Sequence, residues 1–145
     1  MSNPGPAVTT NTPVQNLSSD QAIRLLGKVN GVSMNAVADT IIPMINTGSF
    51  SVSNVIVTNA SASLAQAVAG TYTAAAAGGT TIVTAAALSG ATGPSIVVQQ
   101  IVASTANPGV TAPQNSLYFR VTTVNTAAAT ADVYIYGYAF DPLVN

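Results

Sequence analysis

Ionisable side chains, which supply most enzyme chemistry, are scarce in this sequence. The 145 residues contain no His, no Cys and no Glu. The acids are Asp20, Asp39, Asp132 and Asp141, and the bases are Arg24, Lys28 and Arg120. General acid–base and covalent catalysis need an acid, base or nucleophile beside a second group that tunes its pKa. Seven charges spread along the chain do not predict such a pair, so we expect no enzyme activity and no catalytic residues.

The same scarcity argues against a metal or cofactor site. Zinc, copper and haem sites use imidazole or thiolate ligands, and calcium and magnesium sites use clustered oxygen ligands. The glycine-containing segments at 78–79 and 90–93 lack both the lysine of a phosphate loop and the spacing of a dinucleotide fingerprint. We expect turns in these segments, and no cofactor or metal.

The net charge of −1 bears on the partners of the chain. Nucleic-acid binding and attraction to anionic lipid both draw on a basic surface, which this composition does not provide. Neither nucleic acid nor membrane is therefore an expected partner. The N-terminus has no signal-peptide pattern, and no apolar run approaches the roughly 20 residues that span a bilayer. We expect synthesis as a soluble protein in the cytoplasm.

Low charge combined with high hydrophobicity is the most unusual property of the chain. Charged residues make up 5% of the sequence and hydrophobic residues 48%. Globular domains usually have about a quarter of their residues charged, which keeps small monomers soluble. A surface this neutral is better suited to being covered by copies of the same chain or by a larger assembly.

The N-terminal part divides into two predicted segments. Residues 1–16 are rich in proline, which predicts an extended arm, either a frayed terminus or an arm that orders on a neighbouring subunit. For residues 17–35 we expect a short helix and a linker, because Ser18 and Gln21 have capping-box spacing and Gly27 ends the apolar pattern. The candidate attachment residues are Pro4, Pro6, Pro13, Leu17, Ile23 and Leu26.

Residues 36–145 are rich in Val, Ile, Thr, Ser and Ala, with turn residues at short intervals, which predicts an antiparallel β-sandwich or barrel. Pro43 inside an apolar run indicates an edge strand or a bulge, and the slip in alternation at residues 53–54 indicates a bulge. The alanines at 74–77 are expected to form a loop or single turn because Gly78 follows. The expected strands cover residues 37–46, 50–58, 64–73, 80–87, 95–103, 116–124 and 131–140.

The last two expected strands alternate cleanly, and a hairpin around residues 125–128 would pair them. One register would put Phe119 beside Val133, and would place Arg120 beside Asp132 on the other face. That other face is a candidate subunit or ligand contact face, and it consists of Tyr118, Arg120, Asp132, Tyr134, Tyr136 and Tyr138. Its tyrosines are open to three interpretations, namely a half-buried sheet surface, a subunit contact and a platform for sugar rings.

Four segments carry a resemblance to a known family. They are residues 56–64 (IVTNASASL), 70–83 (GTYTAAAAGGTTIV), 117–123 (LYFRVTT) and 128–137 (AATADVYIYG). Together they resemble a small β-domain of tailed-bacteriophage virion proteins, among them the capsid decoration, or cement, proteins. The resemblance implies a jelly-roll-like β-sandwich, often a homotrimer, that sits on an icosahedral head and clamps adjacent copies of the major capsid protein.

Two functional hypotheses follow from the sequence. The first is a virion structural protein that decorates and stabilises the capsid surface, with itself and the major capsid protein as partners. The alternative is a glycan-binding or host-recognition module of a phage fibre or tail, using the tyrosine face around Tyr118 and Tyr134. A major capsid or tail-tube subunit is a third possibility, but the chain is short for the former and has no obvious long insertion loop for the latter.

Overall fold

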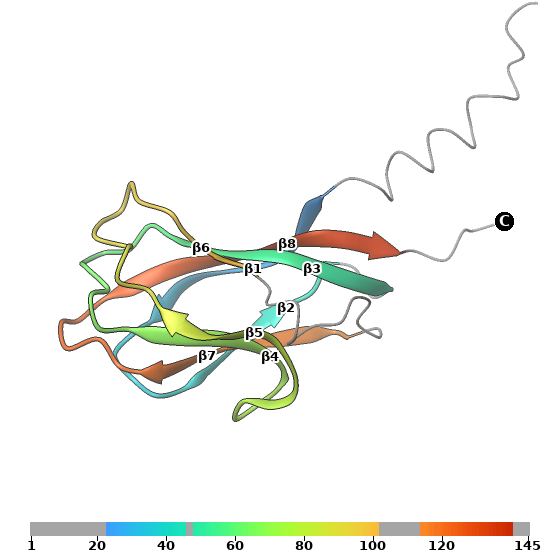
Figure 1. The fold of residues 1–145 in the computed structure, drawn as a ribbon, viewed down its shortest axis with the longest axis horizontal. Coiled ribbons are helices and arrows are strands. Elements are labelled where there is room, and N and C mark those ends of the chain that lie inside the picture. The colour runs from blue at the N-terminus through green and yellow to red at the C-terminus, as the bar shows by residue number, and fades with distance from the viewer. Residues whose placement is uncertain (1–22, 46–47, 102–113, 141–145) are drawn as a thin grey trace, which may run out of the picture.

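A computed structural model describes residues 23–45, 48–101 and 114–140. These residues form an all-β fold of two antiparallel sheets, which lie one above the other as two layers (Figure 1). The strands are β1 (Arg24–Ser33), β2 (Asp39–Pro43), β3 (Ser49–Thr58), β4 (Val68–Ala74), β5 (Gly78–Ala87), β6 (Val98–Ile101), β7 (Ser116–Thr123) and β8 (Thr130–Phe140).

The strands pair in a nested order. The first sheet has the order β1-β8-β3-β6 and the second has the order β2-β7-β4-β5. The first strand therefore pairs with the last, the second with the seventh, the third with the sixth, and the fourth with the fifth. All strands that neighbour each other in a sheet, apart from β4 and β5, are distant in the sequence. The chain crosses from one layer to the other at every connection except the turn between β4 and β5.

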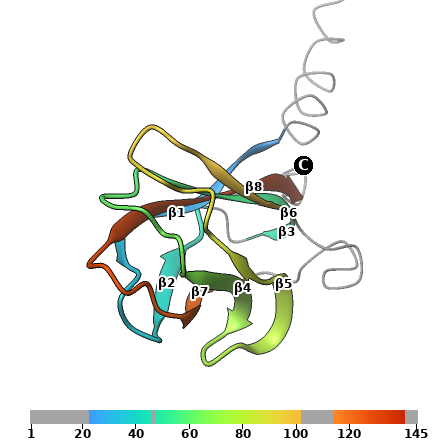
Figure 2. The ribbon, with the colours of Figure 1, turned by 60° about the vertical axis from the view of Figure 1, so that its left-hand side comes forward.

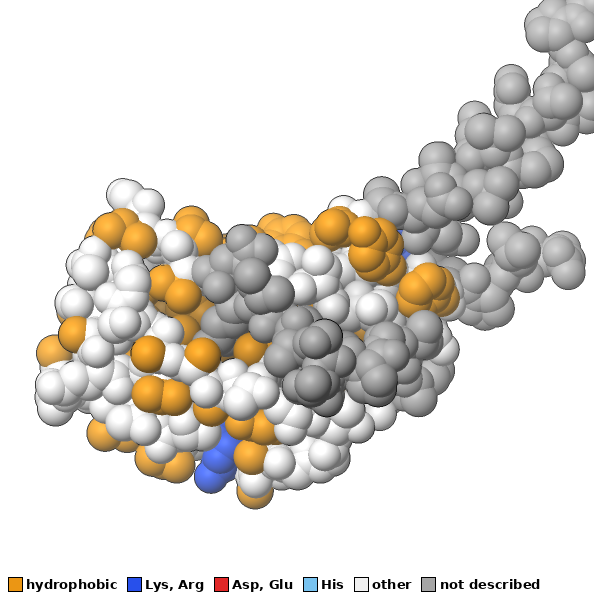
Figure 3. Space-filling model, viewed as in Figure 1, with side chains coloured by type: hydrophobic (Ala, Val, Ile, Leu, Met, Phe, Trp, Pro, Cys, Tyr) orange, Lys and Arg blue, Asp and Glu red, His pale blue; other side chains and the backbone are white. Residues whose placement is uncertain are grey.

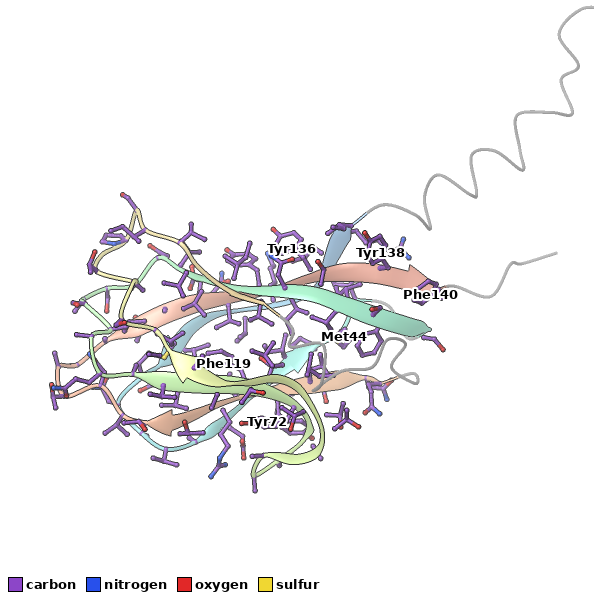
Figure 4. All side chains as sticks on the ribbon, in the orientation of Figure 1. Met44, Tyr72, Phe119, Tyr136, Tyr138 and Phe140 are labelled. Atoms are coloured by element: carbon purple, nitrogen blue, oxygen red, sulfur yellow. The ribbon has the colours of Figure 1, made fainter. Side chains whose placement is uncertain are left out.

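Alternating side chains build the core between the layers. In β8 every second residue from Ala131 to Ala139 is buried, and in β7 the buried residues are Leu117, Phe119 and Val121. Phe50 of β3 joins them from the first sheet, and Phe119 and Met44 project into the space between the sheets (Figure 4). Both layers thus bury one face against a shared apolar core, while their other faces point outward.

The two layers are joined along one side of the molecule. Gly27 of β1 forms an isolated antiparallel bridge with Met44, and the Ile45 N–H donates to the Leu26 carbonyl at 2.7 Å. These bonds connect β1 and β2, the edge strands on that side of the two sheets. On the other side, β5 and β6 are the edge strands, one in each layer (Figure 2).

Seven of the observed strands correspond to the strands expected from the sequence, with shifted ends. β2 is an edge strand, which confirms the position inferred from Pro43. The register between β3 and β8 shifts between Val52 and Asn54, which confirms the expected bulge. Residues 75–77 form the turn between β4 and β5, and Ala76 and Ala77 both have positive φ.

The helix prediction is wrong wherever the structure tests it. Residues 24–33 form β1, which pairs with β8 inside the first sheet, so the sheets begin well before residue 36. The rest of the expected helix, and the arm at 1–16, lie outside the described residues. The local spacing favoured a helix, but Leu26 reaches 0% exposure in the core as part of a strand. Tertiary burial against the second sheet outweighs the weak local preference.

The predicted hairpin of the last two strands is also wrong. β7 and β8 belong to different sheets, and the connection around residues 125–128 crosses between the layers. Phe119 lies opposite Thr40 and Thr71, whereas Val133 lies opposite Val29 and Val57. Both strands bury their apolar face in the same core, so the pattern that suggested one sheet arises from two facing sheets.

Gly137 provides a test of how closely β8 and β3 approach. A Cβ atom at this position would collide with the Ser51 carbonyl oxygen and lie 2.9 Å from the Val52 Cα. We expect Gly137→Ala to lower the free energy of unfolding by about 2–3 kcal/mol, because backbone cannot yield as a flexible side chain can. Urea titration followed by circular dichroism measures the loss.

Gly93→Ala is the matched control, because no atom lies within 4 Å of the Cβ added there. Its effect should stay within about 0.5 kcal/mol. Equal effects of the two substitutions would contradict the close approach of β3 and β8.

Candidate functional site

The structure divides the predicted tyrosine face between the two outer surfaces. Tyr134, Tyr136 and Tyr138 lie on the outer face of the first sheet, each partly exposed. Tyr118 lies on the outer face of the second sheet, on the opposite side of the molecule. The prediction of one face that carries all four tyrosines is therefore wrong. Figure 4 shows Tyr136 and Tyr138 on the outer side of the upper layer.

The three tyrosines of β8 form what we call the β8 tyrosine stripe. Successive members are two residues apart on a straight strand, which spaces them by about 7 Å. The neighbouring strands contribute Lys28 and Ile56 beside Tyr134, and Leu25 and Asn54 beside Tyr136. Phe140 extends the stripe at the end of β8 and is 43% exposed. The β8 tyrosine stripe is therefore flanked by aliphatic and polar side chains of β1 and β3.

On the outer face of the second sheet, Gly70 leaves space that the Tyr72 side chain occupies. Tyr118 lies between Ile41 of β2 and Tyr72 of β4, and the Tyr72 hydroxyl lies 2.8 Å from where a Gly70 Cβ would be. The absence of a side chain at Gly70 leaves room for the Tyr72 ring, which is only 7% exposed although it lies on the outer side of its sheet. Figure 4 places Tyr72 below the lower layer. Sequence alone gave no sign that this tyrosine folds onto its own strand.

Arg120 pairs with Asp39 and not with Asp132. The Arg120 Nη1 donates to Asp39 Oδ2 at 2.9 Å, and the two residues lie opposite each other on β7 and β2. The Ala76 N–H donates to the same oxygen at 2.9 Å, which ties the β4–β5 turn to β2. Asp39 Oδ1 is buried and has no hydrogen-bond partner among the described residues. The predicted pairing of Arg120 with Asp132 is wrong because it assumed that β7 and β8 were neighbours.

The environment of Asp39 shifts its acidity. Burial of the carboxyl acts to raise the pKa of Asp39, but the hydrogen bonds from Ala76 and Arg120 and the charge of Arg120 act in the other direction. Together they hold the pKa of Asp39 below its ordinary value of 3.8. The carboxylate is thus the favoured form at neutral pH, and its contacts are structural.

Asp132 joins the irregular part of β1, where the register with β8 shifts, to the residue that follows β3. Its Oδ1 accepts the Gly31 N–H at 2.8 Å, and its Oδ2 accepts Asn59 Nδ2 at 2.9 Å. Gly31 and Asn59 both have positive φ, a conformation that needs support when the residue is not glycine. Asp132 thus has a structural role at two irregular points of the backbone.

Two asparagines fasten one end of the layers together. Asn35 Nδ2 donates to the Asn125 and Ala127 carbonyls at 3.0 and 2.6 Å, and its Oδ1 accepts the Ala129 N–H at 2.7 Å. Asn125, 4% exposed, donates from its side chain to the Ser63 carbonyl at 3.0 Å. Side-chain amides that both donate and accept hydrogen bonds stabilise a connection that lacks regular strand pairing. No sequence motif marked either residue.

The structure describes two of the six candidate attachment residues, Ile23 and Leu26. Pro4, Pro6, Pro13 and Leu17 lie outside the described residues. Ile23 is 52% exposed just ahead of β1, whereas Leu26 belongs to the core and is not available to a partner.

The described surface carries little charge. Of the five charged residues between 23 and 140, Asp39 and Arg120 pair with each other, and Asp132 accepts two hydrogen bonds. In the view of Figure 3, the described part of the surface consists mostly of hydrophobic and uncharged atoms, with a small basic area at its lower margin. Within the described ranges, no group of three or more potential metal ligands gathers. The same ranges contain no helix long and apolar enough to cross a membrane.

Comparison with known proteins adds no relative. No known protein-family model, curated protein or solved structure matches the chain at a significant level. Its function must therefore be argued from the surfaces and contacts described above.

The Asp39 contacts give a prediction for stability as a function of pH. Because the pKa of Asp39 is lowered on folding, its contribution is fully present above the unfolded value of 3.8 and is lost as pH falls through the folded pKa. We expect Asp39→Asn to lower the free energy of unfolding by about 1–2 kcal/mol at pH 7. The difference from the wild type should shrink below about pH 4. Chemical denaturation at several pH values measures it.

Arg120→Gln is the partner variant for a double-mutant cycle. Each single substitution breaks the same ion pair, so the double variant should be less destabilised than the sum of the two. Losses of stability that add strictly in the double variant would contradict the ion pair between Asp39 and Arg120. A stability difference between wild type and Asp39→Asn that stays constant down to pH 2 would contradict the stabilising role of the Asp39 carboxylate.

Proposed function

We propose that the two sheets form a jelly-roll-like β-sandwich. A jelly roll has eight strands in two four-stranded antiparallel sheets. The nested pairs β1–β8, β2–β7, β3–β6 and β4–β5 support a jelly roll. The repeated crossings of the chain between the two layers support it as well. Such a fold presents two broad outer faces and several loops, and it supports many functions, so function must come from the surfaces.

The function that these surfaces support best is that of a virion decoration protein on the outside of an icosahedral phage head. The main support for this proposal is the nearly neutral outer surface, on which most of the described charged groups bond to other groups of the same chain. Contact of such a surface with copies of the chain and with the major capsid protein leaves few charges to desolvate. The resemblance of four segments to phage decoration proteins points in the same direction and suggests a trimer.

Binding of the assembled shell provides the mechanism of stabilisation. A protein that binds the assembled shell but not separate subunits shifts the equilibrium towards the shell by mass action. Burial of apolar surface at about 25 cal/mol per Å² supplies the affinity. The β8 tyrosine stripe, with Phe140 at its end, brings together more partly exposed aromatic side chains than any other described strand and is the proposed contact face.

The role of the N-terminal arm can be tested directly. We expect removal of residues 1–16 to weaken association with capsids lacking the protein, while the sandwich keeps its circular dichroism spectrum and unfolding midpoint. Occupancy on purified particles is measured by quantitative mass spectrometry. Unchanged occupancy together with an unchanged fold would show that the arm has no part in attachment.

Glycan binding is the second candidate, and the β8 tyrosine stripe is the observation that favours it. Partly exposed tyrosines beside Lys28 and Asn54 offer ring faces for stacking on sugars and polar groups for their hydroxyls. If this reading holds, the wild type should bind members of a glycan array, and Tyr134→Ala should weaken binding by about tenfold.

Tyr118→Ala is the matched control, because Tyr118 lies on the other sheet. It should leave glycan binding unchanged. Absence of any bound glycan, or equal loss from both substitutions, would count against the sugar platform.

A further inference from the structure

The edge strand β2 and the residues that follow it carry an exposed apolar stripe. Ile42 and Met44 are buried in the core, so Ile41, Pro43 and Ile45, which alternate with them, point to the outer side. Ile45 and Ile41 are 66% and 58% exposed, the highest values among the large hydrophobic residues of the described ranges. We call Ile41, Pro43 and Ile45 the β2 apolar stripe.

The surroundings of the β2 apolar stripe favour an uncharged, apolar partner. Tyr118 of β7 lies opposite Ile41 and is partly exposed, which adds an aromatic ring to this surface. Asp39 and Arg120 form the next row on the same two strands, and they pair with each other. Because this ion pair is already formed, binding beside it needs no charge on the partner.

The sequence that precedes the described residues has the composition of such a partner. Residues 1–16 contain no charged side chain, and three of them are prolines, at positions 4, 6 and 13. Proline-rich segments favour the extended polyproline II conformation and bind aromatic and apolar surfaces at low entropic cost. At about 3.1 Å per residue, such a segment spans about 50 Å, whereas the β2 apolar stripe is about 13 Å long.

The described chain begins beside the β2 apolar stripe, with β1 antiparallel to β2. Gly27 of β1 forms an antiparallel bridge with Met44. The Ile45 N–H donates to the carbonyl of Leu26, one position nearer the start of β1. The chain that precedes β1 therefore leaves at the Ile45 end, and it must reverse direction to reach Ile41 of the same copy. A neighbouring copy can be reached without this reversal.

We propose that the β2 apolar stripe is an interaction surface, and that its occupant is the N-terminal arm, residues 1–16, of a second copy of the chain. The arm of one copy meets the stripe of the next, and such heterologous contacts close into a ring when the rotation between copies allows it. A trimer is one such ring. The inference concerns the isolated protein and does not depend on the capsid function. The stripe is small, so we expect reversible association that rises with concentration.

Ile41→Lys tests the stripe in the full chain, and Val97→Lys is its matched control. Val97 is 57% exposed, close to the value for Ile41, but it lies just before β6, a strand of the other sheet. A lysine in the stripe would lose water when the arm binds, which costs free energy. Sedimentation over a range of concentrations measures self-association. We expect Ile41→Lys to associate at least about tenfold more weakly than the wild type, and Val97→Lys to associate as the wild type does.

A mixture of two variants tests whether the arm crosses between copies. The arm variant carries Pro4→Asp, Pro6→Asp and Pro13→Asp, which put charges into the arm and leave the stripe intact. Alone, this variant should associate about as weakly as Ile41→Lys. In the mixture, the intact arm of the Ile41→Lys protein can bind the intact stripe of the arm variant. Native mass spectrometry should therefore detect complexes that contain both chains.

Circular dichroism and thermal unfolding establish that each variant is folded, and Ile45→Lys replaces Ile41→Lys if the latter does not fold. A wild type that stays monomeric at every concentration would overturn the proposal. Wild-type association by the stripe variant or by the arm variant would overturn it, as would equal weakening by Val97→Lys. A mixture without mixed complexes would overturn it too, and this includes the case in which each arm covers the stripe of its own copy.

Discussion

The apolar layer shared by the two sheets is the constraint on which the other features depend. Phe50 and Phe119 meet there from opposite sheets, and every second residue of β8 points into it. A chain without cysteine forms no disulfides, so burial of this apolar layer is the main interaction that holds the two sheets together. Alternation sends the remaining residues of each strand outward, so the composition of the outer faces is fixed by the same pattern that fills the core.

The few charges are used mainly to hold irregular backbone in place. Asp39 connects β2, β7 and the β4–β5 turn, and Asp132 supports Gly31 and Asn59 at the ends of regular pairing. Asparagine amides do similar work between the layers at Asn35 and Asn125. Because these charged groups bond mainly within the chain, the outer faces of the described strands consist mostly of uncharged side chains. Covering a surface of that kind costs little free energy of desolvation, because few charges lose their contact with water.

Local patterns predicted the strands well, because alternation, Pro43 and the slip before Asn54 are properties of short segments. Partners of strands were not predictable in the same way. Adjacent strands in the sequence suggested a hairpin of β7 and β8, but the nested order places them in different layers, and alternation looks the same in both cases. β1 was missed because Ser18, Gln21 and Gly27 have the spacing of helix signals, while the burial of Leu26 depends on contacts with distant strands.

The candidate site was likewise predictable within one strand but not between strands. The tyrosines at 134, 136 and 138 share a face because they share a strand, whereas the placement of Tyr118 required knowledge of the sheet to which β7 belongs. We propose that the neutral outer faces of the two sheets are covered in an assembly. An image of the particle that contains this chain, at a resolution that traces its strands, tests this most directly. We expect the chain to lie on the outside of an icosahedral shell, with the β8 tyrosine stripe covered by a neighbouring subunit. A chain whose two outer faces are both open to solvent in the particle would contradict it.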